Sequence, residues 1–490
     1  MTQPTATLEQ DPARNAHGQD HAPLLERAFA LDVVEAAYEI AGVRGEIPAY
    51  LNGSYYLNGP SAFGRGGLAY RHWLDGDGMV SALHFAGGKA RFVNRFVRSA
   101  KFVAEQEAGR SLYRAFGTAF EGDRLKRGIG LESPVNVSVF TWRGTLLAFG
   151  EQGLPWELDP ETLETRGEHT FGGRLNAVSP LSAHPCFDRE RGEMFNFGIS
   201  FAARQPCLHL YRFAADGELA WRRRLALPYP CSVHDFIVSP RYVAFYLSPY
   251  LLDVEAVMRG GKTIMEALSW EPERGSRLLV ASRETGEEVA SVPLGRRFCL
   301  HLVNAFEEDG RLVVDVVELD RPIYDQYQVI PDLFLDAPRG RPRRRVIDAE
   351  RWEVVGEDEI DYSVAPDFPA IDPRRALKPY DDLWLLGISK TGTPGRKFFD
   401  QIAHVSWRRP SGPDVYQAAP RHYFGGEPVF LGDPGDAGAG VVICQDFDAE
   451  AMASSFLVFD AYDVAAGPVA VLPLKHPLPP CFHASWEPRG

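Results

Sequence analysis

Leu312-Val-Val-Asp-Val-Val-Glu318 is the run of residues that decides the fold class of this chain. Its valines are stiff at χ1 and pack well on a pleated surface, so the run favours a β-strand. Similar short runs recur between turn signals at 53–57, 90–96, 137–140, 145–149, 208–213, 242–247, 277–281, 404–406 and 441–445. This rhythm predicts an all-β protein.

The chain is expected to form one domain from residue 26 to residue 490, preceded by a flexible N-terminal tail over residues 1–25. No shift of composition marks an internal boundary, and the Pro/Arg-rich segment 335–345 is predicted to be a surface loop. An all-β domain of this size must protect many sheet edges, which a propeller does by radial repetition around a central channel. No clean blade repeat is visible, so periodicity alone does not predict the propeller.

Helical spacing is best over residues 99–114 and 251–267. The second segment carries an apolar stripe. Two explanations are open for it: packing in the core, or an apolar rim at a membrane-facing entrance. Its members are Leu251, Val254, Val257, Met258 and Met265.

Composition excludes several classes of protein. The formal charge of −14 is spread over both signs, which disfavours a nucleic-acid partner. Six scattered cysteines without a CxxC pair indicate reduced thiols, and hence a cytoplasmic protein. No apolar run reaches the roughly 18 residues of a membrane-spanning helix.

The chemistry of the chain is expected in its histidines, of which there are thirteen. Nine have ordinary surroundings or lie in the predicted tail: His17, His21, His72, His84, His169, His209, His404, His422 and His476. Four stand in distinctive local contexts, namely His184, His234, His301 and His483. Their sequence gaps of 50, 67 and 182 residues are too wide for a zinc finger and suit ligands delivered by separate blades. Spacing alone does not establish a metal site.

Ordered motifs from about residue 44 to residue 488 resemble those of the carotenoid cleavage oxygenase family. They are Gly45-Glu-Ile-Pro48, Leu51-Asn-Gly-Ser-Tyr-Tyr-Leu-Asn-Gly-Pro60, His72-Trp-Leu-Asp-Gly-Asp-Gly-Met79, Leu146-Leu-Ala-Phe-Gly-Glu151, Leu154-Pro-Trp-Glu-Leu-Asp159, Ala183-His-Pro185, Val233-His-Asp-Phe236, His301-Leu-Val-Asn-Ala305 and Phe482-His-Ala-Ser-Trp486. One such motif is weak evidence, but this many in the same order are strong evidence.

The resemblance implies a seven-bladed β-propeller, with helices and loops capping the top face over an axial iron site. It implies one Fe(II) per chain, bound by the catalytic histidines His184, His234, His301 and His483. Neutral imidazoles suit ferrous iron and leave positions open for dioxygen, the implied co-substrate. Metal-bound histidines usually donate their second N–H to a carboxylate. The positions that match the family's acidic partners are Glu151, Glu427 and Asp367, the last replacing the usual glutamate.

Departures from the family's motifs concentrate where the substrate is expected to lie. Val137 stands where a hydroxyl commonly faces the iron, and Gly150 stands where an aromatic residue is common. The other expected pocket residues are Leu74, Phe102, Ser232 and Leu300. The pocket is therefore predicted to differ in shape from those of the relatives.

The resemblance implies a dioxygenase that cleaves a carbon–carbon double bond of a carotenoid or apocarotenoid into two carbonyl products. An apolar rim near 251–265 would dock peripherally on a membrane, where such polyenes reside. Cleavage of stilbenes or related phenylpropenoids is an alternative, disfavoured because Phe102 and Glu132 replace the tyrosine and lysine that hold a phenol. An iron-dependent isomerase and a metal-free binding propeller are further alternatives.

Overall fold

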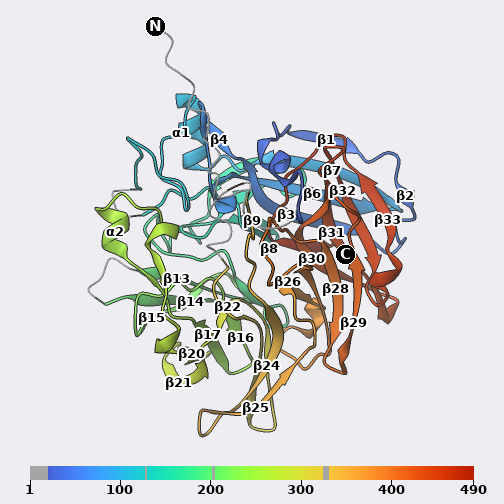
Figure 1. Ribbon diagram of the computed structural model, residues 1–490. Coiled ribbons are helices and arrows are strands. Elements are labelled where there is room, and N and C mark those ends of the chain that lie inside the picture. Colours follow the sequence, from blue (N-terminus) through green and yellow to red (C-terminus); the bar gives the residue numbers. More distant parts are fainter. Residues whose placement is uncertain (1–19, 127–129, 201–204, 324–329, 331, 490) are drawn as a thin grey trace.

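Seven antiparallel sheets make up most of the computed structural model, which describes residues 20–126, 130–200, 205–323, 330 and 332–489 (Figure 1). We number the sheets as blades 1 to 7 along the chain and give their strands in the order in which they pair. Blade 1 holds β34 (Ala484–Pro488), β3 (Gly53–Ala62), β6 (Asp77–Ala86), β7 (Lys89–Phe96) and β1 (Ala36–Glu39). Blade 2 holds β8 (Ser138–Trp142), β9 (Thr145–Phe149), β10 (Trp156–Leu158) and β11 (Thr165–Glu168). Blade 3 holds β12 (Cys186–Asp188), β13 (Glu193–Ser200), β14 (Cys207–Phe213) and β15 (Leu219–Ala226).

The remaining four blades continue the same pattern. Blade 4 holds β16 (Ile237–Val238), β17 (Tyr242–Leu247), β20 (Ser276–Ser282) and β21 (Glu288–Gly295). Blade 5 holds β22 (Phe298–Glu308), β23 (Arg311–Leu319), β24 (Gly340–Asp348) and β25 (Glu353–Glu359). Blade 6 holds β26 (Ala365–Ile371), β27 (Asp382–Ile388), β28 (Gln401–Ser406) and β29 (Arg409–Gln417). Blade 7 holds β30 (His422–Asp433), β31 (Asp436–Asp448), β32 (Ala453–Asp460), β33 (Pro468–Pro473) and β2 (Arg44–Gly45).

Both ends of the chain close the ring of blades. The C-terminal strand β34 pairs with β3 in blade 1, and β2, near the N-terminus, pairs with β33 in blade 7. Blue and red strands consequently lie side by side in Figure 1. Closure leaves few free sheet edges, which is the physical advantage of a propeller for so long an all-β chain. The predicted seven-bladed fold is confirmed.

Innermost strands of neighbouring blades contact one another around the ring, as in the series β16, β22, β26, β30, β34 and β8. The predicted strand runs fall on observed strands, and the run from Leu312 to Glu318 lies inside β23. Its side chains from Leu312 to Leu319 are all buried, because β23 is covered on both faces.

The prediction of a surface loop over 335–345 is wrong in its second half, because β24 begins at Gly340. Arginines are rare in buried strands unless they are paired. Arg345 is 5% exposed and donates to the carboxylate of Glu318 at 2.7 Å, while Arg344 donates to Asp315 at 2.8–2.9 Å. Ion pairs with β23 therefore allow an arginine-rich segment to form a strand.

The helices are short and lie outside the blades. Helix α1 spans Ala100–Ala108, with Ser99 as its N-cap and Gly109 in the left-handed conformation at its end. Helix α2 spans Val254–Met258 and is capped by Asp253. Both fall within the predicted helical segments, as shorter elements. The 3₁₀ helices of the described residues are η2 (Leu25–Ala30), η3 (Trp73–Asp75), η4 (Met265–Ala267), η5 (Pro272–Arg274), η7 (Pro373–Arg375) and η8 (Val464–Ala466). Two small two-stranded sheets pair β4 (Gly64–Arg65) with β5 (Leu68–Ala69) and β18 (Tyr250–Leu252) with β19 (Leu268–Trp270).

Most of the predicted N-terminal tail, residues 1–19, lies outside the described residues. Its last part is packed, since Ala22 and Leu25 are fully buried in the largest core cluster. Asp20 also pairs with Arg396 at 2.7 Å. The packed chain therefore begins before residue 26.

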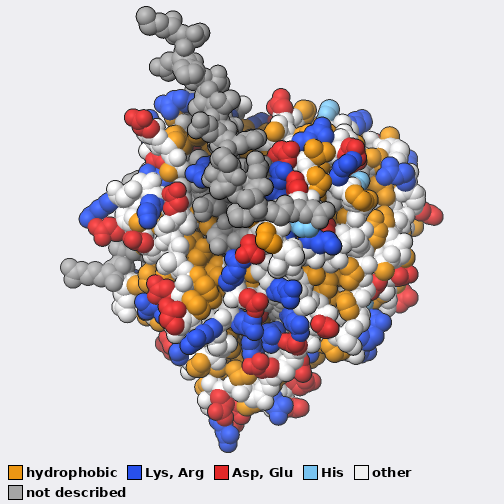
Figure 2. Space-filling view, viewed as in Figure 1, with side chains coloured by type: hydrophobic (Ala, Val, Ile, Leu, Met, Phe, Trp, Pro, Cys, Tyr) orange, Lys and Arg blue, Asp and Glu red, His pale blue; other side chains and the backbone are white. Residues whose placement is uncertain are grey.

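Charged side chains of both signs are interspersed on the face shown in Figure 2, in agreement with the mixed charge of the sequence. Within the described residues, no helix combines the length and the apolar character needed to cross a bilayer.

Candidate metal centre and cavity

Four histidines from four blades meet at the axis of the propeller. His301 lies within β22, and the other three lie one to three residues before innermost strands: His184 before β12, His234 before β16 and His483 before β34. One nitrogen from each ring lies within 4.8 Å of the others. All four rings therefore lie at or near the starts of innermost strands, although up to 182 residues separate neighbours along the chain.

The Nε2 atoms point toward a common centre. Nε2 of His234 lies 2.9 Å from Nε2 of His184 and 3.2 Å from Nε2 of His301. Nitrogens bound at ~2.1 Å to one ion and at right angles to each other lie about 3.0 Å apart. Three of the rings are thus spaced as ligands of a single first-row metal ion, and the ligand nitrogen of the fourth, His483, lies within 4.8 Å of theirs. All-nitrogen ligation with no cysteine suits iron, copper or nickel as well as zinc.

Three of the rings present Nδ1 to a carboxylate. Oε1 of Glu151 lies 2.9 Å from Nδ1 of His234, and Oδ1 of Asp367 lies 2.5 Å from Nδ1 of His301. Oε2 of Glu427 lies 3.3 Å from Nδ1 of His483. Such contacts place the proton on Nδ1 and leave the lone pair of Nε2 for a metal. The three predicted acidic residues are therefore brought to the histidines, and Asp367 reaches His301 directly.

Irregular backbone aims these groups at the axis. Strand β22 is bulged around His301, β26 is bulged after Asp367, and β30 is bulged around Glu427. A bulge adds a residue to one strand and redirects its side chains, which is why bulges concentrate next to active sites. Phe368 has a φ of 53°, a conformation that non-glycine residues rarely adopt. The bulge at Asp367 therefore compensates for its short side chain.

Burial and charge set the protonation of the rings. Burial, followed by the charges of the three neighbouring rings, lowers the pKa of His184 well below its ordinary value. Burial also lowers the pKa of His483, against the opposing effect of Glu427. Burial disfavours charged His301 as well, but Asp367 outweighs it and raises the pKa of this ring. A neutral imidazole is the form that binds a metal.

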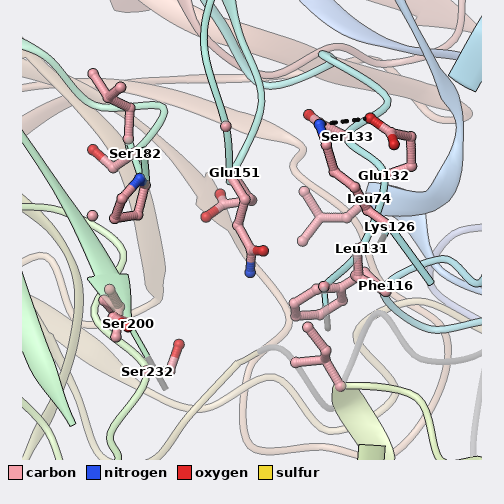
Figure 3. Close-up of a pocket in the computed structure, with 18 of the residues that line it drawn as sticks. Leu74, Phe116, Lys126, Leu131, Glu132, Ser133, Glu151, Ser182, Ser200 and Ser232 are labelled. Atoms are coloured by element: carbon pink, nitrogen blue, oxygen red, sulfur yellow. Dashed lines mark hydrogen bonds and ion pairs between the residues drawn. The ribbon is translucent and has the colours of Figure 1, made fainter. Parts of the chain in front are cut away.

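A cavity of about 450 Å³ lies beside the centre. Its wall includes Glu151, which contacts His234, together with Ser182 and Ser232, which each lie two residues before a histidine of the cluster. Figure 3 shows these serines on one side, Glu151 in the middle and Leu74, Leu131 and Phe116 on the other side. Pockets of this size hold small organic ligands.

The apolar stripe of the α2 region turns toward this cavity. Val254, Met258 and Ile264 line its wall, and Val257 and Met265 are buried. The exposed positions of the same segment are charged or small, and they include Glu255, Arg259 and Lys262. The segment 251–265 therefore forms a cavity wall, and a membrane contact through it stays a prediction.

The predicted pocket residues occupy three different environments. Leu74 and Ser232 line the cavity. Val137 and Leu300 are buried in the core cluster that also contains Leu74, and the backbone oxygen of Val137 accepts a hydrogen bond from the amide of His483. Phe102 does not line the cavity. Its ring stacks on Phe96, and the guanidinium groups of Arg65 and Arg98 lie over it.

Sequence reasoning missed several residues of the site. Lys126 lines the cavity and pairs with Glu132 at 2.9 Å, as the dashed line in Figure 3 shows. Lys126 stands in no motif that predicts a pocket, whereas Glu132 was expected near the substrate only as the replacement of a phenol-holding lysine. Asp235 was not among the predicted site residues either, although it directly follows a candidate ligand in the motif Val233-His-Asp-Phe236 and its Oδ1 lies 3.8 Å from Nδ1 of His184.

A seven-bladed propeller with histidines converging on its axis and carboxylates behind them defines a class of metal-site propellers. The model of the retinal pigment epithelial membrane protein family matches residues 31–488, and this chain belongs to that family. The chain is 29% identical to the apocarotenoid-15,15′-oxygenase of Synechocystis sp., over 94% of this chain and 95% of the relative. It is 30% identical to resveratrol cleavage oxygenase 1 of Aspergillus fumigatus, over 91% of each chain.

Solved structures agree with this assignment. The crystal structure of cobalt-substituted Synechocystis apocarotenoid oxygenase superposes with a TM-score of 0.86 at 28% identity, covering 96% of this chain and all of that one. The chain is accordingly an oxygenase, as the resemblance predicted.

Proposed function

We propose that this chain is a non-haem iron(II) dioxygenase that cleaves a carbon–carbon double bond of a carotenoid or apocarotenoid into two carbonyl products. The observation that carries the proposal is the convergence of four Nε2 atoms, three of their rings fixed by carboxylates, beside a cavity with a largely apolar wall. Kinship to an apocarotenoid-15,15′-oxygenase supports the substrate class.

His184, His234, His301 and His483 would hold one iron(II), which when bound would activate dioxygen next to the alkene. In the overall reaction the double bond breaks and each of its carbons takes one oxygen atom of dioxygen. The two carbonyl products therefore account for every atom, and no external reductant is required.

The work of the protein in this reaction is positioning. The carboxylates of Glu151, Asp367 and Glu427 hold the Nδ1 protons of three rings, which fixes the direction of each Nε2 lone pair. Leu74, Val254 and Met258 give the cavity an apolar wall that binds a polyene and excludes water. A proton-transferring side chain is not required, because the overall reaction moves no proton.

We place residues 26–490 in one catalytic domain, onto which residues 20–25 pack, because β2 and β34 tie both of its ends into the ring. The six cysteines are all unpaired, which supports a reducing compartment such as the cytoplasm. A peripheral contact with a membrane would give the cavity access to polyenes dissolved in lipid.

Cleavage of a stilbene or another phenylpropenoid is the second candidate. It is favoured by the ion pair of Lys126 and Glu132 in the cavity wall, which offers a polar partner for a substrate hydroxyl. Phe102 lies outside the cavity lining, so a tyrosine at this position would add no hydroxyl to the cavity wall. Its absence therefore does not count against a phenolic substrate. A relative named for resveratrol cleavage supports this candidate.

The test combines metal analysis with oxygen uptake and product mass, using protein loaded with Fe(II) and a panel of apocarotenals, carotenoids, hydroxystilbenes and isoeugenol. We expect one iron per chain, one dioxygen consumed per alkene, and aldehydes from a polyene. Aldehydes from the phenolic substrates alone would favour the second candidate. Iron with isomerised product and no oxygen uptake would identify an isomerase, and a chain that binds no metal would overturn the proposal in favour of a metal-free binding propeller.

A further inference from the structure

Within the described part of the chain, only three of the four histidine rings have a carboxylate within hydrogen-bonding distance of Nδ1. For the fourth ring, His184, the nearest recorded carboxylate oxygen is Oδ1 of Asp235, at 3.8 Å from Nδ1. Among the residues that the structure describes, no nearer acceptor is recorded for this nitrogen. Glu151, Asp367 and Glu427 therefore do not account for the orientation of the His184 ring.

Asp235 is held firmly in place. Its side chain is 9% exposed, its Oδ1 accepts the amide N–H of Phe236 at 2.7 Å, and its Oδ2 accepts the amide N–H of Leu302 at 2.7 Å. A buried carboxylate with two such bonds has little freedom to move. The position of this carboxylate is therefore built into the fold.

The bond to Leu302 has a specific structural reason. Strand β22 is bulged on both sides of Leu302, which follows His301, so the ladder with β23 is interrupted there. A buried amide N–H that loses its ladder partner requires another acceptor. Asp235 supplies this acceptor from the turn that carries His234. One carboxylate thus joins the backbone segments of two candidate ligands and faces the ring of a third.

We propose that Asp235 is a positioning residue of the metal centre, which accepts the Nδ1 proton of His184 while it fixes the bulged strand that carries His301. A carboxylate oxygen has two lone pairs, so Oδ1 can accept from Phe236 and His184 together. The ring needs to approach by roughly 0.8 Å to reach an ordinary hydrogen-bond length of about 3.0 Å. Metal binding to Nε2 favours this approach, since it fixes the proton on Nδ1.

This inference rests on the proposed metal site, and its test separates the two. The full chain, prepared without metal, is titrated with Co(II), whose visible spectrum reports ligand number and geometry. Wild-type protein that binds no Co(II) would overturn both proposals. With wild-type binding established, Asp235→Asn is expected to weaken Co(II) binding about 10- to 100-fold and to change the spectrum.

Asp446→Asn is the matched control. Asp446 is also a buried aspartate that contacts a histidine ring, at 2.9 Å from Nδ1 of His422, but that ring lies outside the cluster. The control is expected to lower thermal stability without altering the affinity or the spectrum. Equal Co(II) affinity and identical spectra for Asp235→Asn and wild type would overturn the inference.

A second measurement covers the case in which Asp235→Asn does not fold. In a crystal structure of the Co(II)-loaded wild type, the distance from Nδ1 of His184 to Oδ1 of Asp235 is expected to shorten to an ordinary hydrogen bond. A distance that stays near 3.8 Å, or a different acceptor for this nitrogen, would refute the role given to Asp235.

Discussion

Oδ1 of Asp367 lies 2.5 Å from Nδ1 of His301 and also accepts the amide N–H of Phe368 at 2.9 Å. This short side chain reaches the ring because β26 is bulged after Asp367 and Phe368 adopts a positive φ. The backbone is thus adapted to an aspartate at this position. The other carboxylate oxygen of Asp367, Oδ2, is buried with no hydrogen-bond partner among the described residues.

Replacement of Asp367 by Ala is expected to lower metal affinity about 10- to 100-fold, because His301 loses the group that fixes its tautomer. Asp367→Glu is expected to keep the metal, since the carboxylate remains and the partnerless Oδ2 tolerates a new position. Equilibrium titration with Fe(II) under anaerobic conditions measures both. Metal loss in the glutamate variant would show that the bulge accepts only the shorter side chain.

His234→Ala is expected to abolish both iron retention and turnover, because Nε2 of His234 lies 2.9 Å from that of His184 and 3.2 Å from that of His301. Iron content and product formation are measured after desalting. His404→Ala is the control, since His404 is also buried, pairs with Asp382 at 2.9 Å and lies outside the cluster. Full activity in His234→Ala would refute the four-histidine assignment.

Gly150→Ala is expected to destabilise the fold by about 1–3 kcal/mol through overpacking. A Cβ at Gly150 would lie 2.1 Å from Oγ of Ser133, so the serine must move. The double variant Ser133→Ala/Gly150→Ala is expected to recover part of the loss. Urea denaturation of the two single variants and the double variant checks this coupling, and strict additivity would contradict it.

Met258→Trp is expected to raise the KM for a long polyene several-fold, because Met258 lines the cavity. Iron content and thermal stability are expected to stay close to wild type, because Met258 belongs to none of the metal-holding segments. Steady-state kinetics with a long and a short substrate measure the effect. Glu255→Gln, an exposed change on the same helix, is the control. An unchanged KM for the long substrate would exclude α2 from the substrate path.

The pair of His422 and Asp446 is expected to make stability depend on pH. The hydrogen bond that the His422 ring donates to the carboxylate of Asp446 raises the pKa of His422. Because the pKa of His422 is raised on folding, the contribution of this pair to the stability of the fold is fully present below the unfolded-state pKa of about 6.5. It is lost as the pH rises through the folded-state pKa. His422→Gln is therefore expected to destabilise by about 1 kcal/mol or less near pH 6, and less near pH 9. Chemical denaturation at both pH values measures this, and a larger loss near pH 9 would contradict it.

The sequence by itself determined the class of fold and the four histidines. Valine-rich runs such as the one inside β23 are stiff and fit a pleated sheet whatever surrounds them, so local chemistry was sufficient. The four histidines were recognisable because each stands in a motif that keeps its order along the chain. Neither conclusion required knowledge of which strands become neighbours.

Only the tertiary structure decided the remaining groups at the metal centre and the cavity. The strand β24 was hidden because its arginines are neutralised by acids on β23, a pairing that no local pattern reveals. Phe102 was displaced from the expected pocket by its packing between Arg65 and Arg98, and Lys126 entered it. The role of Asp235 depends on a bulge in a strand 67 residues away. Contacts of this kind join residues far apart in sequence, so their chemistry exists only once the ring of blades has closed.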